Sequence, residues 1–133
     1  MTCIRNFIAL ATACSIALGS PAAFAKVGER DDTYFTLLDC AAVDIVESVA
    51  TDDTAQKAAR EERATRWTTV AIFYSQLPED QFDVIRIDHE AATRKVYDLS
   101  LSSDRAGYRK LQGDCKSLEP AMQDAHAAMM DDG

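Results

Sequence analysis

The sequence contains few of the residues that build catalytic and metal centres. It has only 2 histidines and 5 glycines among its 133 residues. It has no Cys-x-x-Cys, His-Glu-x-x-His or Glu-x-x-His motif, no glycine-rich phosphate loop and no Gly-x-Ser-x-Gly elbow. These motifs mark redox and haem proteins, zinc proteases, di-iron bundles, nucleotide-binding proteins and serine hydrolases. We therefore expect no catalytic residue, no metal site and no cofactor.

One weak hint of a metal site lies near the end of the sequence. Sulfur and imidazole ligands favour copper, and the last turns carry both in Met122, His126, Met129 and Met130. Their spacing is too loose to define a ligand set, so we assign them no metal.

Basic side chains are also scarce, with 14 Lys and Arg against 22 Asp and Glu, a formal net charge of -8. Nucleic acids and anionic membranes are bound by clustered cations, so neither is expected as a partner. The densest basic cluster, Arg60, Arg63 and Arg66, is interleaved with Glu61 and Glu62. That mixture of charges predicts a solvated helix face.

Long apolar runs are absent except near the start. The run from Phe7 to Leu18 follows Arg5 and precedes Ala23-Phe24-Ala25, the pattern of a secretory signal peptide. It is too short for the ~20 residues of a membrane span. We expect cleavage near Ala25, which leaves a single helical domain over residues 26–133 in the periplasm or outside the cell, without membrane insertion.

A lipid anchor at Cys14 is the alternative fate of this leader. The leucine usual three residues before such a cysteine is missing, because Ala11 stands there. Signal-peptide cleavage is therefore favoured.

Two of the 4 cysteines, Cys40 and Cys115, remain after cleavage. In an oxidising compartment they predict one disulfide. A redox-active pair is the alternative, but it lacks both the Cys-x-x-Cys spacing and the alternating strands and helices of thioredoxin-like folds.

Hydrophobic periodicity predicts four helices and no strands. The aromatic residues Trp67, Phe73 and Tyr74 fall at helical spacing and are expected in the core, although they could also line a ligand cavity. The predicted helices cover residues 34–49, about 54–76, 82–99 and from near 104 to Pro120.

Four helices with short connections favour an all-α, up-down-up-down four-helix bundle. The first and last helices are neighbours in that topology, so the disulfide would close the bundle. An orthogonal helical array is the alternative. Pro120 is expected to end the last helix or to restart the chain in a new direction, which leaves residues 119–133 as a tail that can fray or remain disordered.

His89 is the candidate buried polar site. It lies in a stripe with spacings of 3, 4, 3, 4 and 3 that otherwise consists of Phe82, Ile85, Ala92, Val96 and Leu99. A histidine on such a face can be a pH-sensitive switch or a ligand. More often it is a core residue whose ring nitrogens are satisfied by neighbours, which is the interpretation we favour.

Two cysteine-containing segments carry a family resemblance, DCAAVDIV at residues 39–46 and GDCKSL at residues 113–118. Together with the leader, they resemble the small exported two-cysteine all-helical proteins of Gram-negative bacteria. The layout is similar to periplasmic immunity proteins, which neutralise cell-wall-cutting effectors. From the sequence as a whole we expect a non-enzymatic protein that binds an unknown protein partner. Inhibition of a secreted hydrolase and a stress-response chaperone role are the alternatives.

Overall fold

The computed structural model describes residues 30–132, so the expected signal peptide over residues 1–25 lies outside the described residues. Within the described part the chain forms four long helices and no strand, as predicted. The helices and one short 3-10 turn are α3 (Asp32–Ala50), α4 (Thr54–Ser75), η2 (Glu79–Gln81), α5 (Phe82–Leu101) and α6 (Arg105–Asp131).

Aspartates at the helix starts set the boundaries of three helices. The carboxylate of Asp31 accepts hydrogen bonds from the backbone N–H groups of Thr33 and Tyr34, at 3.0 and 3.2 Å. Asp53 and Asp104 cap α4 and α6 in the same way. Each cap satisfies backbone donors that the first helical turn leaves without partners.

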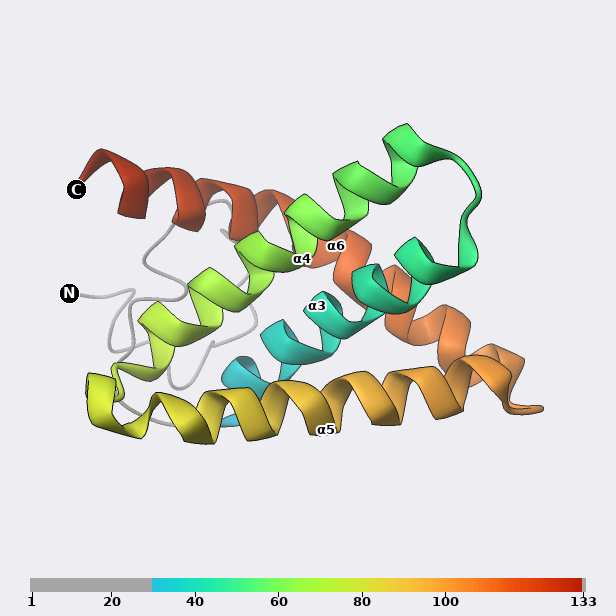
Figure 1. Ribbon diagram of the computed structural model, residues 1–133, viewed down its shortest axis with the longest axis horizontal. Coiled ribbons are helices and arrows are strands. Elements are labelled where there is room, and N and C mark those ends of the chain that lie inside the picture. The colour runs from blue at the N-terminus through green and yellow to red at the C-terminus, as the bar shows by residue number, and fades with distance from the viewer. Residues whose placement is uncertain (1–29, 133) are drawn as a thin grey trace, which may run out of the picture.

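The four helices run up, down, up and down in chain order, and α3 lies between the other three (Figure 1). Helix α3 packs against α4, α5 and α6, and most extensively against α4 and α5. The sequence predicts a core face over half of this helix, but all five residues from Cys40 to Asp44 are buried. Five consecutive helical residues cover the whole circumference, so α3 is enclosed on every side over this stretch.

The disulfide joins the central helix to the last one. Cys40 of α3 and Cys115 of α6 are bonded, with their Cα atoms 5.4 Å apart and a sequence separation of 75. Both cysteines are buried. The predicted pairing is confirmed, and a loop of this length corresponds to about 4.5 kcal/mol of stabilisation in the chain-entropy account.

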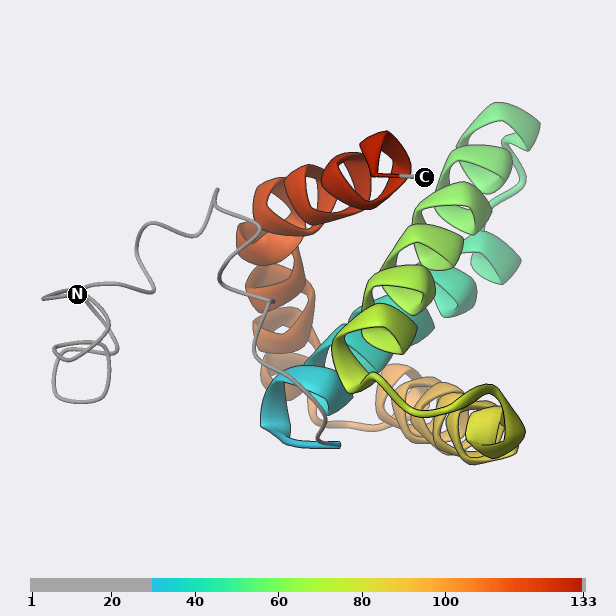
Figure 2. The ribbon, with the colours of Figure 1, turned by 90° about the vertical axis from the view of Figure 1, so that its left-hand side faces the viewer.

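The predicted break at Pro120 and the expected disordered tail are wrong. Helix α6 continues through Pro120 to Asp131, and Figure 2 shows the helix changing direction along its length. Proline removes one backbone hydrogen bond and bends a helix. Beyond it, Ala121, Met122 and Ala125 are buried in the core, so this last segment is held by packing.

Loss of the disulfide should weaken the fold measurably. We expect Cys115→Ser to lower the free energy of unfolding by about 2 to 5 kcal/mol and to leave Cys40 open to thiol reagents after unfolding. Denaturant titration measures the first effect and thiol labelling the second. The Cys40→Ser/Cys115→Ser double variant controls for the unpaired thiol. Labelling of both cysteines in the native oxidised protein would contradict the disulfide.

The packed end of α6 gives a second prediction. Met122 is fully buried, whereas Met130 is 59% exposed on the same helix. We expect Met122→Ala to cost about 2 to 5 kcal/mol, because it leaves a cavity, and Met130→Ala to cost less than about 0.5 kcal/mol. Denaturant unfolding of both variants checks this. Equal, small effects would mean that the segment after Pro120 does not pack in solution.

Candidate functional site

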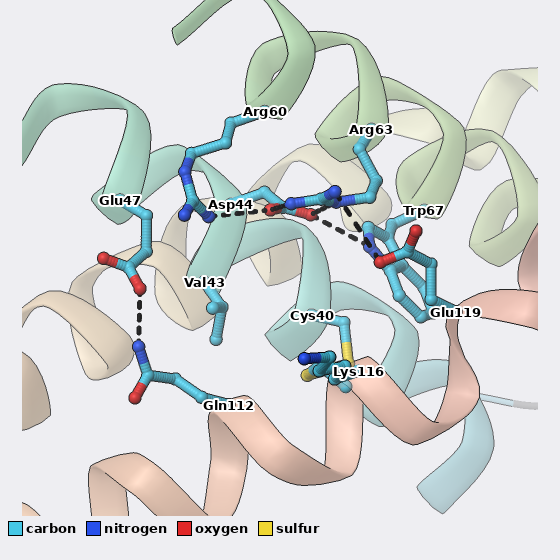
Figure 3. Close-up of a pocket in the computed structure, with 11 residues that line it drawn as sticks. Cys40, Val43, Asp44, Glu47, Arg60, Arg63, Trp67, Gln112, Lys116 and Glu119 are labelled. Carbon is cyan, nitrogen blue, oxygen red and sulfur yellow. Dashed lines mark hydrogen bonds and ion pairs between the residues drawn. A yellow bond between two sulfur atoms is a disulfide. The ribbon is translucent and has the colours of Figure 1, made fainter. Parts of the chain in front are cut away.

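A charged cavity lies between α3, α4 and α6 beside the disulfide (Figure 3). Its volume is about 290 Å³. The two cysteines, Val43 and Trp67 line it, and its polar lining consists of Asp44, Glu47, Arg60, Arg63, Gln112, Lys116 and Glu119. Three acids and three bases therefore surround one small space.

Asp44 is the innermost charge of the cavity and is only 4% exposed. Arg63 donates two hydrogen bonds to its carboxylate, from Nε to Oδ2 at 2.9 Å and from Nη2 to Oδ1 at 2.7 Å. The indole N–H of Trp67 donates to Oδ2 at 3.1 Å. A buried carboxylate needs such partners, because burying an isolated charge costs several kcal/mol.

Two further charges extend this cluster toward solvent. Arg60 Nη1 lies 3.6 Å from Asp44 Oδ1, and Arg63 Nη1 lies 3.6 Å from Glu119 Oε1. These separations exceed ordinary hydrogen-bond lengths. The hydrogen bonds to Asp44 raise the pKa of Arg63 above its ordinary value, burial opposes that rise, and the charges of Asp44 and Glu119 add to it. Arg63 therefore stays protonated.

The α6 side of the cavity is less tightly paired. The side-chain amide of Gln112 donates to Glu47. Lys116 is exposed, and among the described residues it makes no hydrogen bond or ion pair. Lys116 thus brings an unpaired positive charge to the mouth, and Arg60 brings one whose single ion pair within residues 30–132 is the 3.6 Å contact with Asp44.

Helical spacing brings the lining residues together. Cys40, Asp44 and Glu47 lie along one face of α3, and Arg60, Arg63 and Trp67 lie along one face of α4. The expectation that Arg60, Arg63 and Arg66 form only a solvated face is wrong. Arg63 reaches inward to Asp44, and Arg66 holds Gln123 of α6 at 2.7 Å as well as Glu62.

His89 lies outside this cavity. It is half-buried, so the prediction that it is removed from water is wrong. It borders a second, shallower hollow between α4 and α5, together with Ile72 and Phe82. Ile85, Ala92 and Val96 of its stripe are buried as predicted, but Phe82 is exposed. His89 thus marks the edge of the core.

The predicted core aromatics divide between two environments. Trp67 and Tyr74 are buried, whereas Phe73 is 54% exposed. Trp67 also lines the cavity, so it belongs both to the core and to the lining of the cavity.

A separate polar network fixes the start of α3. Arg30 and the hydroxyl of Tyr34 both donate to Asp88 of α5, each at 2.8 Å from Oδ2. Tyr74 of α4 donates to Asp31 at 2.8 Å. Burial, with help from the bond to Asp88, raises the pKa of Tyr34 well above its ordinary value. This network links three helices, and we assign it a structural role.

Residues 30–132 contain no group of three or more histidine, cysteine or acidic side chains placed to hold a metal ion. No helix within the same range is long and apolar enough to cross a membrane.

Comparison with known proteins finds no relative. No family model, no curated protein and no solved structure matches this chain.

The buried charge cluster predicts a large stability effect. We expect Asp44→Ala to lower the free energy of unfolding by about 3 kcal/mol, because the substitution leaves Arg63 and Trp67 without their hydrogen-bond acceptor. This value is at the lower end of the range for a broken buried ion pair, because Arg63 keeps some contact with water.

Asp39→Ala is the matched control for this prediction. It removes an acid from the same helix, where Asp39 pairs with the exposed Lys95 at 2.6 Å, and should cost at most about 1 kcal/mol. Denaturant unfolding compares the two variants. Equal losses would contradict the role of Asp44 as an interior anchor.

Proposed function

We propose that this chain is an exported, non-enzymatic binding protein that acts on another protein. The observation that carries the proposal is the cavity beside the disulfide, with Lys116 and Arg60 at its mouth. Lys116 makes no hydrogen bond or ion pair within residues 30–132, and Arg60 has only the 3.6 Å ion pair with Asp44, so the two cations together suit a carboxylate. The partner would insert an acidic side chain or a carboxyl terminus.

The size of the cavity favours a protein over a small-molecule ligand. A volume of about 290 Å³ is at the lower end for pockets that enclose a whole small molecule. It is sufficient for one or two side chains. A side chain presented by a folded partner would bring additional contacts around the mouth, which a free small molecule lacks.

The pairing inside the cavity supports binding over catalysis. Both oxygens of Asp44 already accept hydrogen bonds, from Arg63 and Trp67. A general base must instead reach the proton that it removes. The charges inside the cavity thus hold the three helices in place, and the cations at the mouth are the groups that would bind the partner.

Net charge adds a condition on the partner. The chain carries a formal charge of -8, which attracts basic surfaces over long range and speeds encounter with them. A basic partner that carries one exposed acidic group would satisfy both the overall field and the cationic mouth. A secreted hydrolase held by an inhibitor of this kind is one such pair, in keeping with the resemblance to periplasmic immunity proteins.

Affinity capture from a periplasmic extract of the source organism tests the proposal. The bait is the oxidised protein, compared with Lys116→Glu, which reverses one charge at the mouth. Lys110→Glu is the control, because Lys110 is an equally exposed lysine of α6 outside this cavity, paired only with Asp114.

We expect at least one protein, identified by mass spectrometry, to be retained by the wild type and by Lys110→Glu and lost with Lys116→Glu. Its dissociation constant should rise by about tenfold or more with Lys116→Glu. Equal retention by all three baits would contradict the assignment of the cavity, and a substrate turned over by the purified protein would contradict the binding role.

A further inference from the structure

The outward face of α5 carries a stripe of side chains that the fold does not use. Ile87, Glu90, Arg94, Tyr97 and Leu101 follow one another at spacings of 3, 4, 3 and 4. This is the repeat of a helix that packs against another helix. The stripe lies roughly opposite the buried residues Ile85, Ala92 and Val96, and Figure 1 shows α5 along one edge of the molecule.

The apolar members of the stripe are strongly exposed. Ile87, Tyr97 and Leu101 are 56%, 50% and 69% accessible to solvent. The outer face of a surface helix is normally polar. Several large apolar residues aligned on one such face mark an interaction surface more often than single exposed ones do.

We propose that this stripe pairs with the same stripe of a second copy, with the two α5 helices antiparallel. Four of the five stripe residues are symmetric about Ala92, since Ile87 and Tyr97 lie five positions on either side of it and Glu90 and Arg94 lie two, whereas Leu101 has no counterpart in the stripe. A two-fold axis near Ala92 therefore brings Ile87 against Tyr97 and Glu90 against Arg94 of the other copy. Such self-complementarity is what a two-fold symmetric dimer requires.

The charges select this arrangement over its alternatives. In a parallel pair Glu90 would face Glu90 and Arg94 would face Arg94, and like charges in contact are unfavourable. Arg94 makes no hydrogen bond or ion pair among the described residues. Glu90 holds only Arg86, at 2.9 Å and with both side chains more than half exposed, and such a surface pair contributes little.

The contact involves one helix from each copy. A stable interface usually buries ~800 Å² on each side, and a stripe of five residues provides less. The dimer is therefore reversible and forms as concentration rises. The lining of the charged cavity comes from α3, α4 and α6, so pairing through α5 leaves the charged cavity of each copy open. The dimer would therefore present two identical binding sites.

Charge reversal across the interface tests the proposal. Sedimentation velocity over a concentration series measures association of the oxidised mature protein. The variants are Glu90→Arg, Arg94→Glu and the double swap of both residues, and circular dichroism verifies that each remains helical. Lys110→Glu on α6 is the control for a change of net charge.

We expect the wild type and Lys110→Glu to dimerise, and each single reversal to weaken the dimer by at least about tenfold, because like charges then meet twice. The double swap should restore the dimer, and an equal mixture of the two single variants should form a heterodimer.

Two results would overturn the proposal. A dimer that is unaffected by either single reversal places the contact elsewhere on the molecule. If the wild type stays monomeric at every concentration, the α5 stripe does not pair with a second copy and must contact a different partner. Failure of this test leaves the cavity assignment intact, because Lys116 and α5 are tested by separate variants.

Discussion

The enclosure of α3 by the other three helices is the constraint on which the rest of the structure depends. From Cys40 to Asp44, where α3 is buried on every side, a polar residue has no access to solvent. Asp44 therefore lies in the interior, and it needs donors from a neighbouring helix. Arg63 and Trp67 of α4 supply them. The disulfide from Cys40 then fixes α6 against the same region, and the space left between the three helices is the charged cavity.

Most of the fold follows from local patterns in the sequence. The spacing of apolar residues gives four helices, aspartates give the starts of three of them, and two cysteines in the expected mature chain give the disulfide. Pro120 is the exception. The local rule predicts a break there, at a cost of about 3 kcal/mol for a proline inside a helix. The burial of Met122 with Ala121 and Ala125 offsets that cost, and such packing depends on distant residues that a local rule does not include.

The cavity was less predictable than the fold. Arg63 lies between charged neighbours, and its local pattern is the same whether its long side chain extends into water or reaches across to another helix. The available signal was on α3, where Asp44 follows Cys40 by one helical turn, so an acid lies beside a cysteine expected to face another helix. His89 shows the opposite error. Its stripe correctly marks a packed face, but a residue at the edge of that face remains partly in contact with water.

The two surfaces assigned a binding role differ in chemistry and in position. The cavity offers a small cationic mouth on an otherwise acidic protein, which favours a partner that presents a single carboxylate. The outer stripe of α5 combines apolar residues with one charge of each sign, which favours a copy of itself. Because different helices carry them, the two surfaces can be occupied at the same time. This separation would let a reversible dimer present two mouths to one partner assembly.

Trp67 provides the most direct test of the central claim, that the cavity beside the disulfide is the binding site. It is the single tryptophan of the sequence and lines the cavity wall. Fluorine-labelled tryptophan incorporated into this chain reports on that wall alone, whatever aromatic residues the partner contains. The account predicts that the fluorine resonance shifts when the captured partner is added to the wild type, and that the shift is absent with Lys116→Glu at the same partner concentration. Binding of the partner with an unchanged resonance would contradict it.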